Sequence, residues 1–100
     1  MYKRGKSLAG KHVVVFVVRN GKNENRVGIS ASKKIGNAVY RNRARRRIKE
    51  AYRLIEPKLD NGYDIAIIPR AAVLEDAFVD IVSGLGNLMR KHNVWKKSAN

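Results

Sequence analysis

The chain has 100 residues, of which 44% are hydrophobic and 30% charged, and it contains no cysteine. This length and composition predict a single globular domain over residues 1–100, and the lack of cysteine excludes disulfides and thiolate metal sites. Lys and Arg number 22 against 8 for Asp and Glu, a net charge of +14. Self-repulsion on this scale favours a polyanionic partner such as nucleic acid.

The first third of the chain is predicted to form strands. Residues 11–19 are β-branched and aromatic, which favours a buried strand, and residues 7–9 add a short strand before it. Apolar and small residues alternate over residues 26–32, which predicts another strand. The polar residues 20–25 lie between the two longer strands, so we expect a hairpin with a long loop.

The remainder is predicted as helix, strand and helix. Apolar residues recur at three- and four-residue steps over residues 37–56, which predicts an amphipathic helix that ends before Pro57. Residues 63–68 favour a buried strand that joins the hairpin sheet, and residues 74–89 carry a second helical stripe. Gly84 and Gly86 in that stripe suggest close packing against a neighbour. This order predicts an α+β two-layer sandwich with helices packed on one small sheet.

No segment is predicted to enter a membrane or to direct export. The longest apolar run, residues 13–18, has six residues, whereas a membrane-spanning helix needs about 20. The basic start of the chain is not followed by the apolar stretch of a signal peptide. We therefore expect a cytoplasmic protein with no membrane partner.

Positive charge is concentrated in one segment. Residues 33–53 contain nine Lys and Arg residues and a single acidic residue, Glu50. A solvated helix face usually mixes both signs, whereas here like charges recur at four-residue spacing, each pair costing a few tenths of a kcal/mol. Arg also suits bidentate contact with phosphate. These features favour a nucleic-acid contact over the alternative, a merely solvated charged face.

The residues before the predicted helix have two interpretations. Gly36 allows close backbone approach, and the free N–H groups of a helix start bind anions. The same residues fit an ordinary helix capped by Asn37, and the sequence does not decide between the two.

The sequence contains no recognisable catalytic motif. His12 and His92 are the only histidines, and the carboxylates are scattered, without HExxH, paired acids or a Walker motif. We expect His12 on a strand face and His92 as a helix-end cation. No catalytic residue is predicted, and a nuclease site built from distant carboxylates is the less favoured alternative.

Residues 29–50 closely resemble the signature of the bacterial ribonuclease P protein subunit. The match runs through Lys33-Lys34-Ile35-Gly36-Asn37-Ala38-Val39 and then Arg41-Asn42-Arg43. It extends to Gly5-Lys6-Ser7-Leu8-Ala9, Gly62-Tyr63-Asp64-Ile65, Pro69-Arg70 and the last helix, which is nearly the whole chain. The resemblance implies a ribonuclease P protein-like α+β fold with a left-handed βαβ crossover, against the usual right-handed rule.

The resemblance also implies a division of labour. In this family the RNA subunit cleaves precursor tRNA with bound Mg²⁺, and the protein binds that RNA and the 5′ leader. The implied partners are ribonuclease P RNA and precursor tRNA, with no organic cofactor and no required protein partner; the atoms that would bind metal in this chain are unknown. With the charge pattern, the RNA-binding candidates are Lys33, Lys34, Asn37, Arg41, Asn42, Arg43, Arg45, Arg46, Arg47, Lys49 and Arg53.

The leader-binding cleft is implied at Tyr2, Phe16, Ser30 and Ser32. Aromatic rings suit a single-stranded leader because stacking tolerates any base and is worth roughly 1–3 kcal/mol per base. Phe16 fits core packing equally well, and Trp95 is expected to pack the last helix down. Family members carry further residues ahead of the position of Tyr2 that form most of a first helix. One wall of the cleft is therefore expected to be missing, with weaker leader contact but intact RNA binding.

Composition alone also fits a ribosomal or ribosome-assembly RNA-binding protein, and only the signature over residues 33–50 separates the two. A DNA-binding architectural protein is less favoured, because no helix-turn-helix or zipper pattern is present.

Overall fold

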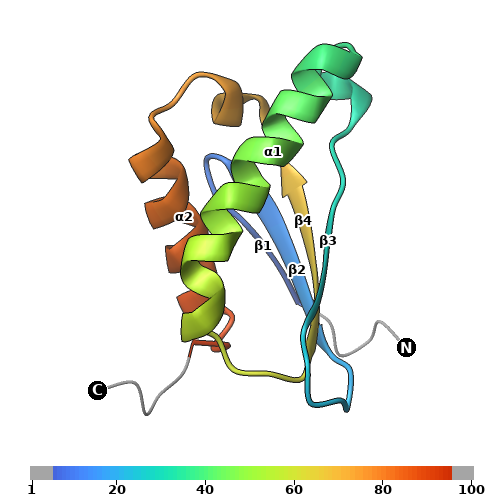
Figure 1. Ribbon diagram of the computed structural model, residues 1–100, viewed down its shortest axis with the longest axis vertical. Helices are drawn as coiled ribbons and strands as arrows, with labels where there is room; N and C mark the ends of the chain where they lie inside the picture. The colour runs from blue at the N-terminus through green and yellow to red at the C-terminus, as the bar shows by residue number, and fades with distance from the viewer. Residues whose placement is uncertain (1–5, 96–100) are drawn as a thin grey trace.

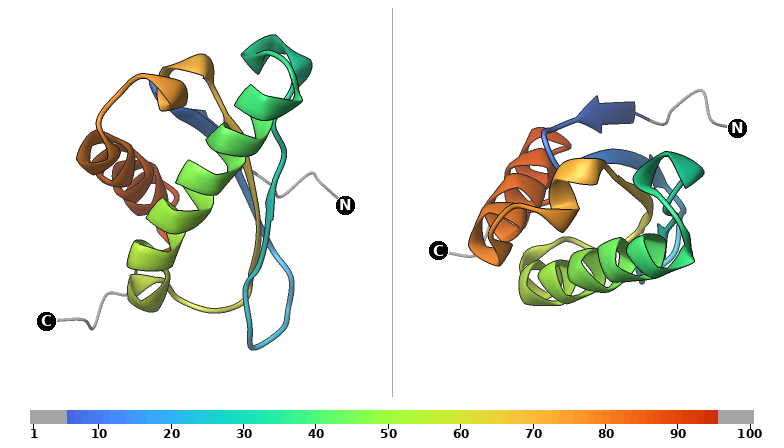
Figure 2. Two further views of the ribbon diagram at one scale, coloured as in Figure 1. Left: turned by 45° about the horizontal axis from the view of Figure 1, so that its top comes forward. Right: turned by 90° about the horizontal axis from the view of Figure 1, so that it is seen from above.

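The computed structural model describes residues 6–95, which form a four-stranded sheet with two helices (Figure 1). The strands are β1 (Lys6–Ala9), β2 (Val13–Arg19), β3 (Arg26–Ile29) and β4 (Tyr63–Pro69), and the helices are α1 (Ala38–Ile55) and α2 (Phe78–Lys91). Both helices lie on the same side of the sheet (Figure 2), which confirms the predicted two-layer α+β sandwich. No helix in this part of the chain has the length and apolarity to cross a membrane.

The sheet order is β1-β2-β4-β3. β4 pairs antiparallel with β2 and parallel with β3. The predicted hairpin between the second and third strands is therefore wrong, because β4 lies between them. The prediction that the strand after the first helix joins the same sheet is confirmed.

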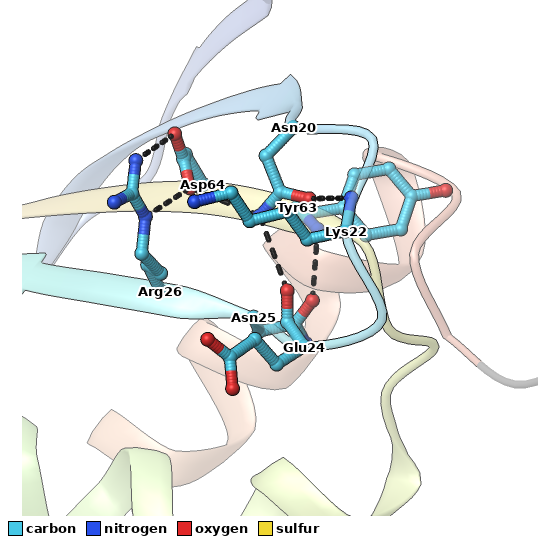
Figure 3. A network of polar contacts seen from close by, with 7 residues as sticks. All are labelled: Asn20, Lys22, Glu24, Asn25, Arg26, Tyr63 and Asp64. Atoms are coloured by element: carbon cyan, nitrogen blue, oxygen red, sulfur yellow. Dashed lines mark hydrogen bonds and ion pairs between the residues drawn. The ribbon is translucent and has the colours of Figure 1, made fainter.

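The loop that follows β2 is bonded to the start of β4 instead of closing a hairpin (Figure 3). The side-chain oxygen of Asn25 accepts from the Tyr63 backbone N–H at 2.9 Å. The Asn20 amide donates to Asp64 Oδ1 at 3.0 Å, and its backbone N–H donates to the Gly62 carbonyl at 3.0 Å. These bonds attach the loop to β4, which lies between β2 and β3.

Burial explains why β4 is central and β3 is at the edge. Ile65 and Ile67 of β4 are 3% and 0% exposed, whereas Val27 of β3 is 40% exposed. On the opposite face of β3, Gly28 contributes no side chain and Arg26 is exposed. The strand with the larger apolar content thus gains a neighbour on both sides.

The connection from β3 through α1 to β4 is left-handed. In Figure 1 both strands run upward, α1 passes in front of the sheet, and β4 lies to the left of β3. With the helix in front of the sheet, a right-handed βαβ unit places its second strand to the right of the first. Here the second strand lies to the left, so the unit has the opposite hand to almost all βαβ units. The handedness implied by the family resemblance is confirmed.

Side chains along β2 point alternately to the two faces of the sheet. Val13, Val15 and Val17 are buried under the helices. Phe16, between them, is half-buried and lies on the face away from the helices with Val14. Core packing was the alternative interpretation of Phe16, and the structure does not place Phe16 in the helix-covered core.

α1 begins and ends as predicted. The Asn37 side chain caps it by accepting from the backbone N–H groups of Val39 at 3.1 Å and Tyr40 at 3.2 Å. Ile48 is 0% exposed, whereas Arg46 is exposed, as the predicted helical phase requires. The apolar stripe that packs on the sheet consists of Ala44, Ile48, Ala51, Tyr52 and Ile55.

α2 begins at Phe78, four residues later than the predicted stripe, because the chain is extended at Ala77. Asp76 just before it is held by contacts to other elements. Its carboxylate accepts from His12 Nε2 at 2.7 Å and pairs with Lys11 Nζ at 3.1 Å, and its carbonyl accepts from Arg47 Nη2 at 2.6 Å. Leu74, expected in this helix, lies in a separate short turn, Ala71–Leu74.

The glycines of α2 are confirmed as close-packing positions. A Cβ at Gly84 would lie 3.1 Å from His12 Nδ1, and one at Gly86 would lie 3.7 Å from the Trp95 ring. Trp95 packs against the core as expected and stacks under the Arg90 guanidinium, 4.3 Å from the ring centroid. The last helix is thus fixed against the chain that follows it.

The two histidines differ from their expected roles. His12 is buried and lies just before β2 instead of on the strand. His92 caps α2, and its Nε2 lies 2.9 Å from the Val15 carbonyl. Burial lowers the pKa of His92 below its ordinary 6.5, which disfavours the expected helix-end cation.

Truncation of Ile48 tests the core. Ile48→Ala is expected to lower the free energy of unfolding by roughly 2–5 kcal/mol, because it leaves a cavity at a fully buried site. Urea denaturation followed by circular dichroism measures this. Arg46→Ala, on the exposed side of the same helix, is the matched control and should change the midpoint little; equal effects of the two variants would contradict the packing.

The carboxylate that anchors the start of α2 predicts a pH dependence. Hydrogen bonds from Lys11 and then His12 hold the pKa of Asp76 below its ordinary 3.8. The stabilisation is therefore complete above the unfolded-state pKa and is lost as pH falls through the lower folded-state pKa. Asp76→Asn should be less stable than the parent at neutral pH, with a gap that narrows below about pH 4. A gap that stays constant in acid unfolding curves would count against this assignment.

Candidate nucleic-acid interface

The basic segment keeps its charge uncompensated in the folded chain. Within residues 6–95 the ion pairs are Lys11 and His12 with Asp76, and Arg26 with Asp64. None involves a cation of residues 33–53. The exposed candidates of this segment are Lys33, Lys34, Asn37, Asn42, Arg43, Arg45, Arg46, Lys49 and Arg53, and Arg41 is half-buried.

One side of α1 forms a groove with the edge strand β3. The groove has a volume of about 630 Å³. Its β3 side carries Val27 and Ile29. Its α1 side is polar, and Glu56 lies just beyond the end of the helix. The α1 residues that line it are Asn42, Arg45, Arg46, Lys49, Tyr52 and Arg53. The helix thus directs four cations toward a hollow instead of spreading them evenly around its surface.

Tyr52 lies in the wall of this groove and is 4% exposed. Burial, with a smaller contribution from the Glu56 carboxylate, raises the pKa of Tyr52 to about 12. Its hydroxyl is buried without a hydrogen bond of good geometry to residues 6–95, although the Asn25 amide lies close enough to oppose the shift. The group therefore stays a neutral hydroxyl at physiological pH.

The start of α1 is an ordinary capped helix end. Asn37 occupies the first N–H groups, and the Ser32 hydroxyl accepts from the Lys34 N–H at 3.3 Å in the preceding turn, Lys33–Ile35. Gly36 has a φ of 137°, and a Cβ there would lie 3.0 Å from the Tyr40 ring. Of the two interpretations of this segment, the Asn37 cap is confirmed, and Lys33 and Lys34 flank it as exposed cations.

Arg47 differs from its neighbours on α1. It is half-buried, its Nη2 donates to the Asp76 carbonyl at 2.6 Å, and its Nε is buried without a partner in the described part of the chain. Arg47 therefore links α1 to the start of α2, a tertiary role that helical periodicity does not reveal.

The sheet face opposite the helices is a second candidate surface. Phe16 lines a hollow of about 370 Å³ there with Arg26, Gly28 and Ala66. A neighbouring hollow of about 440 Å³ includes Val14 of the same strand face and Ser32. Ser30 is exposed, and its N–H extends the ladder between β3 and β4 by donating to Ile67 at 3.0 Å. The structure thus brings Phe16 and Ser32 to one face; Tyr2 lies outside the described residues.

Cations at the rim of this face were not among the predicted residues. Arg26 Nε and Nη2 donate to the two oxygens of Asp64 at 3.1 and 3.2 Å (Figure 3), and this bond holds the pKa of that carboxyl below its ordinary value. Arg70 lines the hollow beside Ser32 and donates to the Gly10 carbonyl at 3.2 Å. Arg26 and Arg70 reach this face through the pairing of strands that are distant in the sequence, so local sequence patterns do not reveal them. Among residues 6–95, no three His, Asp or Glu side chains gather as a metal site.

Comparison with known proteins gives a consistent result. The family model described as Ribonuclease P matches residues 1–93. The ribonuclease P protein component of Clostridioides difficile is 46% identical over 95 residues, covering 94% of this chain and 83% of that protein. The component of Clostridium kluyveri is 44% identical over 98 residues, covering 96% and 88%.

Solved structures with a similar fold come from the same group of proteins as the sequence matches. The RNase P protein of Thermotoga maritima superposes with a TM-score of 0.79 at 32% identity, covering 90% of this chain and 86% of that one. The RNase P protein of Staphylococcus aureus gives 0.79 at 32% identity, covering 95% and 87%. The fold and the sequence thus match the same group of proteins.

Proposed function

This chain belongs to the bacterial ribonuclease P protein family, and from that premise we propose that it acts as the protein subunit of a ribonuclease P ribonucleoprotein. In this role it binds the catalytic RNA and the 5′ leader of precursor tRNA. The RNA subunit removes the leader with bound Mg²⁺, and the protein contributes positioning. This function would place it in the cytoplasm with tRNA processing.

The observation that carries the proposal is the uncompensated positive charge of α1. Burial of Ile48 and Ile55 on the sheet directs Arg45, Arg46 and Lys49 outward without acidic partners in the described residues. Folded RNA supplies the missing negative charge, and each phosphate contact releases counterions. This supports α1 as the surface for the RNA subunit.

The open sheet face is proposed to hold the leader. Phe16 is at a hollow between the strands, and the exposed Arg70 lies at the rim, whereas the charge of Arg26 there is paired with Asp64. A single strand needs a path for its backbone charge and a ring against which any base can stack, so this face suits an extended leader of variable sequence. Ser30 and Ser32 can donate hydroxyl hydrogens to phosphate or sugar at its border.

The alternative of a ribosomal RNA-binding protein shares the charge and the fold class. The family match over residues 1–93 favours the ribonuclease P function over that role.

Reconstitution tests the proposal directly. The full chain, added to a bacterial ribonuclease P RNA at low Mg²⁺, is expected to raise the rate of precursor-tRNA cleavage above that of the RNA alone. Phe16→Ala should reduce the preference for leader-bearing over leaderless substrate by roughly 1–3 kcal/mol if Phe16 stacks one base. Lys91→Ala on α2, outside both surfaces, is the matched control. A chain that gives no stimulation would exclude the proposed function.

Salt dependence tests the α1 contact. If six to ten phosphates are neutralised, affinity for the RNA subunit should fall by roughly 10³ to 10⁵ between 50 and 200 mM salt. Arg46→Ala should lower the slope of log affinity against log salt by about one, because its exposed side chain contributes one phosphate contact. Filter binding over a salt series measures both. A slope unchanged by Arg46→Ala would remove this residue from the interface.

A further inference from the structure

The groove between α1 and β3 differs from the rest of the basic surface because its β3 side is aliphatic. Val27 and Ile29 are in register with Ile65 and Ile67 of β4, so they lie on the helix side of the sheet. Val27 is 40% exposed. Phosphate gains nothing from an aliphatic surface, whereas a nucleobase ring placed there loses contact with water.

The charges in the groove are polarised along its length. Arg45 and Arg46 lie one helical turn from Asn42, and Lys49 and Arg53 follow. Glu56, at the opposite end, is the one carboxylate that lines the groove among residues 6–95. It disfavours phosphate there, so a continuous row of phosphates from a duplex fits poorly, and a single phosphate is best placed near Arg45 and Arg46.

Asn42 has hydrogen-bonding capacity to spare at the groove. Asn42 Oδ1 accepts from Arg45 Nη1 at 3.2 Å, which leaves the amide hydrogens of Asn42 available as donors. The Tyr52 hydroxyl is buried behind the groove surface and lies near the Asn25 amide. The Asn42 hydrogens are therefore the donors that an acceptor atom of a ligand in the groove can reach.

We propose that this groove holds one unpaired nucleotide of folded RNA, with its base against Val27 and Ile29 and its phosphate at Arg45 and Arg46. This inference rests on the proposed function, because the ligand is the RNA that α1 binds. The volume of about 630 Å³ lies within the usual range of ligand sites. A base in a bulge or loop can enter such a hollow, whereas a base inside a duplex cannot.

Three RNAs test the proposal with the unaltered full chain: a fully paired hairpin stem, the same stem with one bulged adenosine, and the same stem with an abasic bulge. Fluorescence anisotropy gives the affinities at one salt concentration. The bulged adenosine should bind about tenfold more tightly than the other two stems, the change expected from burying one base on an apolar surface. Equal affinity for the adenosine and abasic bulges would overturn the proposal.

Two variants locate the effect. Val27→Glu places a carboxylate on the β3 side and should abolish the preference for the bulged adenosine; Val27→Ala, which adds no charge to the edge strand, should reduce it. Arg43→Ala removes an exposed cation that does not line the groove, so it should weaken all three RNAs by the same factor. A preference that survives both Val27 variants in folded protein would place the base elsewhere and refute the assignment.

A precursor-tRNA cleavage assay distinguishes failure of the nucleotide site from failure of the proposed function on which it rests. Stimulated cleavage without any preference for the bulged adenosine would overturn the nucleotide site and leave the proposed function intact. A clear preference that Val27→Glu abolishes and Val27→Ala reduces, in a chain that fails to stimulate cleavage, would support the groove and overturn the ribonuclease P role.

Discussion

The packing of α1 against the sheet is the interaction on which the remaining features depend. Full burial of an isoleucine such as Ile48 is worth about 1.5–3 kcal/mol, whereas a like-charge pair at four-residue spacing costs only a few tenths. Burial therefore decides the rotation of the helix about its axis. Once the apolar stripe faces β4, the helical period places Arg46 and Lys49 at the surface whatever their mutual repulsion. The structure thus holds strong positive charge in a fixed arrangement, ready for a polyanion.

Much of this was predictable because it is local. The period of α1, its cap at Asn37 and its end near Pro57 follow from residues within a few turns of one another. The exposure of Arg46 and burial of Ile48 follow from the same period. The family and the hand of the crossover came from the resemblance over residues 29–50 and not from patterning, which carries no information on handedness.

The errors arose where distant residues compete. β4 pairs between β2 and β3 because its isoleucines gain a neighbour on each side, and no pattern within residues 20–25 reveals that. α2 starts late where the chain is extended at Ala77, next to Asp76, which is bound by His12 64 positions away. Likewise, the groove lies between α1 and the edge strand β3, which only the folded chain brings together, so Val27 could not be recognised as part of a site.

The edge strand β3 has only four residues, and one of them, Val27, lines both the groove beside α1 and the hollow on the open face. β3 therefore lies between the two proposed binding surfaces as a single layer of backbone. If the RNA subunit binds in the groove and the substrate binds on the open face, both would contact β3, and β3 would set their relative position. If the proposed function holds, a small displacement of β3 would reach both surfaces at once and would couple leader recognition to the position of the RNA subunit.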